Sequence, residues 1–361
     1  MMTATYLHSD QEEALYKIID GSPLSGDQPL TPTLKAPDGR PIYNQTGRNT
    51  YKGGLYNEGG GERDVISLAF SRFFNDGDGS FTIGYTHQNI DELSGMASTT
   101  ANSSYGKYAA SDYNNRTAQR SIYETEHRLF ATLSSTHYFF GADKPTTFNL
   151  FFERKSGLPG TYSWDTYTSR NYGGTAYQRE AFGYEKNLND DSSHLIYVPT
   201  GLTDPNVCWG SCSGAPDLAI ANQVLEMLHN TLGLKSYAGQ IVPNGVYEYP
   251  WQTTLDLKIT QILPGFRAED EFVISLGIEN LLNLIDSNKG VIEYGPYNGK
   301  MAVLDMYMND DFSKYIYPNY KGRGYPDWAY GFNQSNPKGI RKSAVNSIWR
   351  AQLGFTYKFS F

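Results

Sequence analysis

Few residues in this 361-residue chain have the type and spacing that chemistry requires. The only cysteines are Cys208 and Cys212, in the segment Cys-Trp-Gly-Ser-Cys. They could form a small disulfide in an oxidising compartment, or stay a free or metal-binding pair. Because no third or fourth ligand lies near them in the sequence, the disulfide is favoured.

Two further patterns lack a required partner. The segment Asn75–Gly79 is similar to the start of a calcium loop, but Thr86 occupies the position where a bidentate glutamate is needed, so we expect a tight turn. His127 and His137 share one face of a predicted strand, yet no serine lies in a nucleophile-elbow setting. We therefore expect a protein that is not an enzyme and needs no cofactor or metal.

Composition restricts the kind of protein that positions these residues. Thirty Lys and Arg against 38 Asp and Glu give a net charge of −8, which argues against nucleic acid as a partner. Aromatic residues make up 14% of the chain and charged residues only 19%, an unusual balance for a packed soluble domain. No apolar run approaches the ~18 residues of a membrane-spanning helix, but strands could still span a membrane.

The clearest periodicity lies at the end of the chain, where residues alternate strictly from Arg350 to Phe361. Apolar Leu353, Phe355, Tyr357, Phe359 and Phe361 fall on one face, and polar residues fall on the other. An edge strand of a soluble sandwich would also alternate. The length and aromaticity of the apolar face favour a strand that faces lipid.

The same alternation predicts three hairpins with short turns, and an opening strand at 2–19 brings the total to about eight strands. The hairpins pair 66–71 with 81–86, 122–140 with 146–153, and 251–262 with 272–279. Long polar connections at about 19–49, 91–120, 165–249 and 286–345 alternate with the short turns. Transmembrane barrels combine short periplasmic turns with long extracellular loops. We therefore predict an all-β fold, a transmembrane antiparallel β-barrel with long extracellular loops.

Two other features belong to this arrangement. Charged side chains project from the side opposite the lipid face, where they would line a polar lumen or simply be solvated; they are Asp256, Lys258, Glu279, Arg350 and Lys358. Within the longest connection, Ala219–Leu232 has helical spacing and predicts a short surface helix.

Several segments resemble a known family. The tract from Leu255–Ile259 through Gly277–Asn283, together with the ending Leu353–Phe361, resembles the end of TonB-dependent outer-membrane receptors, and most closely the Oar-like branch. Weaker similarities lie earlier in the chain and occur in the order found in the family. They are Asp38–Tyr43, Tyr123–Arg128, Lys155–Pro159 and Leu195–Pro199, the last of these before Asp204-Pro205.

The resemblance implies that residues 1–361 are the C-terminal part of a 22-stranded receptor barrel, about eight strands of it. Such receptors import scarce or bulky nutrients, and their plug and TonB-contacting segment would precede this chain. It also implies that Phe355, Tyr357, Phe359 and Phe361 form a sorting signal for the barrel-assembly machinery. Because Met1–His8 contains no secretory signal, we expect a split or truncated product or a start placed too late.

The resulting expectation is a fragment of a receptor and transporter in the cell outer membrane, with lipid and the assembly machinery as partners. Contact with TonB would require the missing N-terminal part. The ligand, whether a small molecule, a glycan or a peptide, cannot be read from loop composition. The alternatives are a complete barrel of about eight strands with a surface-binding or structural role, and a soluble glycan-binding sandwich.

Overall fold

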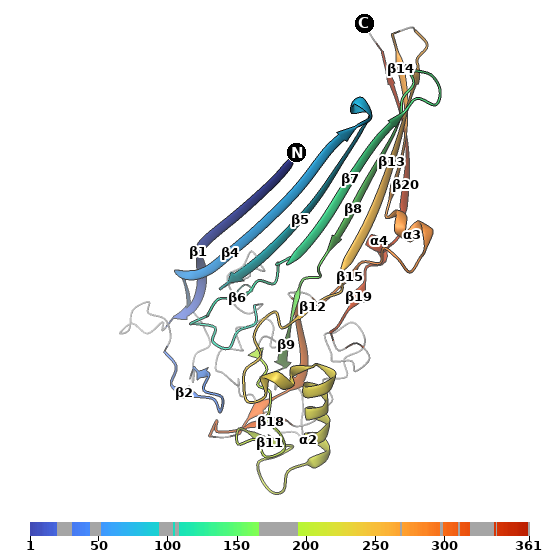
Figure 1. The fold of residues 1–361 in the computed structure, drawn as a ribbon. Helices are drawn as coiled ribbons and strands as arrows, with labels where there is room; N and C mark the ends of the chain where they lie inside the picture. The colour runs from blue at the N-terminus through green and yellow to red at the C-terminus, as the bar shows by residue number, and fades with distance from the viewer. Residues whose placement is uncertain are drawn as a thin grey trace.

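One long antiparallel sheet dominates the computed structural model, which describes residues 1–19, 31–43, 52–93, 104, 108–165, 194–267, 269–296, 299–309, 311–317, 336 and 338–359 (Figure 1). The sheet has nine strands, and its long strands are neighbours in chain order. They are β1 (Met2–Ile19), β4 (Lys52–Phe74), β5 (Gly79–Glu92), β7 (His127–His137), β8 (Thr146–Lys155), β13 (Gln252–Pro264), β14 (Glu271–Glu279) and β20 (Arg350–Lys358). The short β6 (Gln119–Arg120) pairs with the end of β5.

The connections alternate in length, as the sequence predicts. The short turns join β4 to β5, β7 to β8 and β13 to β14, and the first contains a single 3-10 turn, η1 (Asn75–Gly77), in place of a calcium loop. The short turns and both ends of the chain lie at one end of the sheet, and the long connections lie at the other (Figure 1). The predicted mostly β fold with asymmetric connections is therefore confirmed.

The strand predicted over 122–140 is shorter in the structure than the sequence indicated. The sequence predicted a strand over 122–140, whereas β7 covers only His127–His137. Residues before it leave the ladder because Glu124 turns back to β5 and accepts a hydrogen bond from the backbone N–H of Ile90 at 2.7 Å. The residues after His137 form the short turn to β8.

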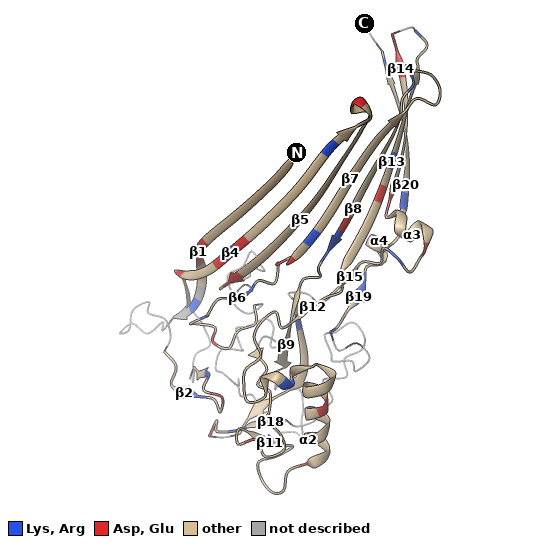
Figure 2. Ribbon diagram, viewed as in Figure 1, with Lys and Arg blue, Asp and Glu red and all other residues tan. Residues whose placement is uncertain are grey.

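The strand register separates the two faces of the sheet. On one face hydroxyl groups pair across neighbouring strands, with Ser67 and Thr86 at 3.2 Å and Ser71 and Thr82 at 2.9 Å. Leu68 and Phe70, which alternate with these serines along β4, point to the opposite face because side chains alternate along a strand. Figure 2 shows that the central parts of the long strands contain few charged residues.

The sheet is open among the described residues. Its strand order runs from β1 to β20, and these two edge strands do not pair with each other. The structure thus confirms a large antiparallel sheet and shows no closure into a barrel among the described residues.

The long connections pack together into what we call the loop unit, the described residues of 31–43, 108–118, 156–251 and 299–317. It contains small sheets and short helices (Figure 1). Its elements are β2 (Leu34–Lys35), β3 (Pro41–Ile42), β9 (Pro159–Asp165), β10 (His194–Leu195), β11 (Val207–Trp209), α2 (Leu218–Leu225), η3 (Glu226–Thr231), η4 (Leu234–Tyr237), β12 (Tyr247–Glu248), β16 (Lys300–Asp305), β17 (Tyr307–Met308) and β18 (Tyr315–Tyr317). Beside the loop unit, β15 (Glu293–Tyr294) pairs with β19 (Arg341–Lys342). The short helix α3 (Leu281–Ile285) directly follows β14, and α4 (Ala344–Ser347) directly precedes β20.

The helix predicted over 219–232 is confirmed as α2 followed by the π-helical turn η3. Asp217 caps its start, because its Oδ1 accepts hydrogen bonds from the backbone N–H groups of Ala219 and Ile220. One side of the helix is buried in the core of the loop unit, through Ala221, Val224, Met227 and Leu228.

Candidate functional site

The polar face of the sheet collects all five charged residues that the sequence placed opposite the lipid face. Across β13, β14 and β20, Lys258 is in register with Gly277, and Glu279 is in register with Arg350. Because alternate residues share a face, Asp256, Lys258, Glu279, Arg350 and Lys358 lie on the same side.

The ion pairs that Arg350 and Lys358 make on this face are exposed. Arg350 Nη1 lies 3.8 Å from Glu279 Oε2, and Lys358 Nζ lies 3.0 Å from Glu271 Oε2. Exposed pairs of this kind typically contribute only about 0–1 kcal/mol to stability. The main effect of these charges is therefore to make the surface polar, and they contribute little to the stability of the sheet.

A hollow of about 440 Å³ lies along the same face. Its polar lining comes from five neighbouring strands of the sheet and includes Ser80, Thr132, Ser134, Asn149, Asp256, Lys258 and Glu279. Such a lining offers hydrogen bonds and charges of both signs to a polar solute, and no cluster among these residues resembles a catalytic constellation.

Asp256 also supports the chain reversal after β14. Its Oδ1 accepts a hydrogen bond of 2.8 Å from the backbone N–H of Asn280, whose φ of 54° places it in the left-handed region. Asn280 tolerates that conformation better than most residues, and its Nδ2 donates to the carbonyl oxygens of Gly290 and Ser347, both at 2.8 Å. In the sequence, Asn280 stands out only as a member of the segment Gly277–Asn283, and its role in the chain reversal was not predicted.

The opposite face of the sheet is apolar and uncovered among the described residues. Ile83 on β5 is 48% exposed, and Leu353 and Phe355 on β20 are 59% and 62% exposed. On β13, Leu255, Leu257, Ile259 and Leu263 extend this surface over eight residue steps, about 27 Å along the strand. A continuous apolar sheet face of this size is unusual on a protein surrounded by water.

Aromatic and histidine side chains lie at the two ends of the apolar face. At the end near the loop unit, the His127 ring stacks on Trp251 with centroids 5.9 Å apart. At the end near the short turns, the His137 ring stacks on Phe139 at 5.4 Å. Amphipathic rings in these positions are typical of the two interfaces of a membrane-spanning barrel.

The terminal strand β20 ends at Lys358, one residue before Phe359 and earlier than the alternation predicted, and Phe361 lies outside the described residues. Phe355 and Phe359 are about 60% exposed, while Tyr357 is half-buried. The Tyr357 hydroxyl donates a 2.5 Å hydrogen bond to Asp270 Oδ2, which ties the strand end to the β13–β14 turn. Among described residues, only one side of β20 is paired, with β14.

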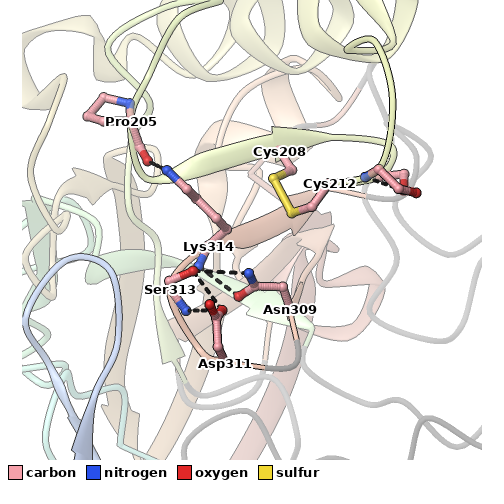
Figure 3. Close-up of a disulfide and its surroundings, with 9 residues drawn as sticks. Pro205, Cys208, Cys212, Asn309, Asp311, Ser313 and Lys314 are labelled. Carbon is pink, nitrogen blue, oxygen red and sulfur yellow. Dashed lines mark hydrogen bonds between the residues drawn. A yellow bond between two sulfur atoms is a disulfide. The ribbon is translucent and has the colours of Figure 1, made fainter.

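Cys208 and Cys212 form a disulfide, with Cα atoms 5.1 Å apart, at the edge of the loop unit (Figure 3). Between them, the buried ring of Trp209 stacks on Tyr317 at 5.7 Å. Figure 3 also shows the neighbouring turn, in which Asp311 accepts hydrogen bonds from the backbone N–H and the hydroxyl of Ser313. These hydrogen bonds lower the pKa of Asp311.

The loop unit contains the main apolar core of the described chain, which sequence reasoning missed. The sequence predicted only long polar connections here, but many of the aromatic rings of the loop unit are fully buried. The largest are Tyr108, Tyr113, Tyr162, Trp164, Trp209, Tyr315 and Tyr317. The signal was present in the density of Tyr and Trp in these segments, because aromatic rings bury large areas.

The segments that carry the weaker similarities meet in pairs. Arg40, in the first of them, donates from Nη1 to the carbonyl oxygen of Leu195 in the last, at 2.8 Å. The backbone N–H of Ser156 donates to the carbonyl oxygen of His127 at 2.9 Å, which joins the other two segments. Residues 29 and 155 positions apart in sequence are thus joined where the loop unit meets the sheet.

No protein-family model matches the chain, and no curated protein sequence matches it significantly. Among the described residues, every helix is too short or too polar to cross a bilayer.

Proposed function

We propose that this chain is part of a β-barrel of the outer membrane, similar to the C-terminal part of an Oar-like TonB-dependent receptor, and that it takes part in importing a scarce or bulky nutrient without catalysing a reaction. The observation that carries the proposal is the division of one long sheet into an exposed apolar face and a charged, hollowed polar face. Lipid on one side and an aqueous lumen on the other account for both faces at once.

The connections support the same proposal. Three short turns at one end of the sheet and a large packed loop unit at the other match the asymmetry between periplasmic turns and extracellular loops. The packed core of the loop unit would give the outer surface a rigid shape, which suits recognition of a specific ligand better than mobile loops.

Two open edges favour a piece of a larger barrel over a complete small one. An unpaired strand edge in lipid leaves backbone N–H and C=O groups without partners at a cost of several kcal/mol each. The proposal therefore requires further strands beside β1 and β20. The alternative, a complete barrel of about eight strands with a surface-binding role, requires β1 and β20 to pair directly.

An immunoblot of purified outer membranes, with an antibody against 251–286, distinguishes these outcomes. A band far above the 40.4 kDa of this chain supports a larger receptor. A membrane band near 40 kDa that shifts on heating, as folded barrels do, supports the small barrel. A product found only in soluble fractions would overturn both.

A further inference from the structure

We propose that His87, Glu126 and His127 form a binding site for a zinc ion on the outer side of the sheet, where β5 and β7 meet the loop unit. One ligand atom from each of the three residues lies within 4.8 Å of the others. Two imidazoles with one carboxylate are ligands that zinc commonly takes, with a fourth position left for water.

The strand register brings the two histidines together. His87 and His127 are direct partners across β5 and β7, and their rings lie 5.0 Å apart between centroids. Glu126 precedes β7, so its carboxylate reaches the same edge of the pair. Ligands around a tetrahedral zinc lie about 3.3 Å apart, given bond lengths of about 2.0 Å, so small side-chain rotations complete the site.

Hydrogen bonds already orient the His87 ring for this role. The carbonyl oxygen of Glu126 lies 3.2 Å from His87 Nδ1, and since a carbonyl can only accept, Nδ1 must carry the proton. In a neutral ring the lone pair is then on Nε2. Histidine ligands usually donate their second N–H to such a partner, which fixes the tautomer and the ring position.

His127 is held in a similar way. Its Nε2 lies 3.2 Å from Glu126 Oε1, and its Nδ1 lies 2.8 Å from the hydroxyl oxygen of Tyr85. A zinc ion between Nε2 and Oε1 displaces the proton from Nε2. In the neutral ring that proton moves to Nδ1, which then donates to the Tyr85 hydroxyl oxygen, so binding changes the tautomer of His127 and both ring nitrogens keep a partner.

The charges around the site favour a cation. Glu126 Oε2 accepts a 2.7 Å hydrogen bond from Arg120, which leaves Oε1 for the metal. The same guanidinium also binds Glu124 at 2.5 Å and Glu248 at 2.8 Å. Three carboxylates thus share one arginine, and the surplus negative charge attracts a divalent ion.

A second cluster on the same face, His8 with Glu62 and Asp64, is a weaker candidate. It offers only one imidazole, and Asp64 Oδ1 already accepts hydrogen bonds from Tyr6 at 2.7 Å and from His8 at 3.0 Å. This cluster is a useful control because it has the same face and a similar charge, but not the two nitrogen ligands that zinc prefers.

The test is calorimetric titration of the purified, folded full chain with zinc chloride, together with the visible spectrum after addition of Co²⁺. We expect one ion per chain, and at least tenfold weaker binding in His87→Gln and in Glu126→Gln. The control variants His8→Gln and His137→Gln should bind as the parent does. Far-UV circular dichroism establishes that each variant keeps its sheet.

Absence of zinc binding by the parent chain at about 100 μM zinc would overturn the proposal. So would unchanged affinity in a folded His87→Gln, His127→Gln double variant, because the ion would then sit elsewhere. The result does not depend on import activity, and it stands or falls separately from the proposed function.

Discussion

Arg40 and Leu195 are 155 residues apart, yet Nη1 of Arg40 donates a 2.8 Å hydrogen bond to the carbonyl oxygen of Leu195. The remaining guanidinium nitrogens bind Asp38, with Nη2 2.7 Å from Oδ2, and the cation lies 4.8 Å from the centre of the Trp164 ring. Both charged side chains are almost fully buried. This one residue therefore joins the connection before β4 to the connection after β8.

We expect Arg40→Ala to destabilise the loop unit by about 3–5 kcal/mol, because it leaves the buried carboxylate of Asp38 unpaired. The urea midpoint followed by tryptophan fluorescence should fall, since Trp164 lies against the guanidinium. Lys35→Ala, which removes an exposed cation from the same connection, is the matched control. Equal midpoints for the two variants would contradict the role given to Arg40.

Gly84 on β5 makes room for the ring of Phe130 on β7. A Cβ built on Gly84 would lie 2.3 Å from the Phe130 ring, whereas one built on Gly277, on the same face of the sheet, meets nothing within 4 Å. We expect Gly84→Ala to cost about 1–3 kcal/mol through overpacking and Gly277→Ala to cost little. Thermal unfolding measures both, and Phe130→Ala should rescue Gly84→Ala. Similar effects of the two glycine substitutions would refute this explanation.

The stability of the loop unit should fall at acid pH because of His194 in β10. Burial, together with the nearby charges of Arg40 and Lys300, lowers the pKa of His194 well below 6.5. Above about pH 7 both the folded and the unfolded states hold this imidazole neutral, so it has no effect. Below about pH 6.5 only the unfolded state takes up the proton, which costs up to about 1.4 kcal/mol of stability per pH unit.

Urea midpoints between pH 7.5 and 5.5 test this dependence. His194→Asn should flatten the profile, and His229→Gln, a histidine of the same loop unit that contacts Pro199, should leave it in place. An unchanged profile in His194→Asn would assign the pH dependence to other groups.

The disulfide closes a short loop, so its effect should be moderate. Replacing Cys208 and Cys212 with Ser together should destabilise the loop unit by about 2 kcal/mol, the chain entropy of a loop of this length. Dithiothreitol should lower the urea midpoint of the parent chain to that of the variant and leave the variant unaffected. A parent chain insensitive to reductant would show that the disulfide contributes nothing.

The aromatic ending should promote outer-membrane assembly of an exported form. Replacing Phe359 and Phe361 with Ser should reduce the amount of chain recovered in outer membranes, because the assembly machinery is expected to pair with this strand. Phe140→Ser removes an aromatic of nearly the same exposure from the β7–β8 turn and is the control. Unchanged membrane yield in the first variant would disprove the sorting signal.

Local patterning predicted the sheet well because each long strand carries its own signal. Alternation along 251–262 and 350–358 depends only on which side chains face outward, and the turn residues 75–79 bend the chain without help from distant segments. The positions of the charged residues on the polar face were predicted from the same alternation of side chains along each strand. Errors arose at strand ends, as at Glu124, where a contact to β5 ends the ladder.

The candidate sites were harder to predict, since their parts come from separate strands. His87 and His127 are 40 positions apart, and only the register of β5 with β7 makes them neighbours. The same holds for Arg40 and Leu195, and for the tyrosines that build the core of the loop unit. Single-sequence periodicity contains no information on how irregular connections fold back on one another.

The sequence by itself thus determined the strands, their two faces, the order of short and long connections and a helix near 219–232, because these depend on residues near one another in the chain. Only the tertiary structure decided that the long connections share a packed core, that Asn280 and Arg40 anchor distant segments, and that the sheet of the described residues ends in two edge strands, each paired on one side only. Those properties depend on contacts between residues far apart in the chain, which form once the strands are in register.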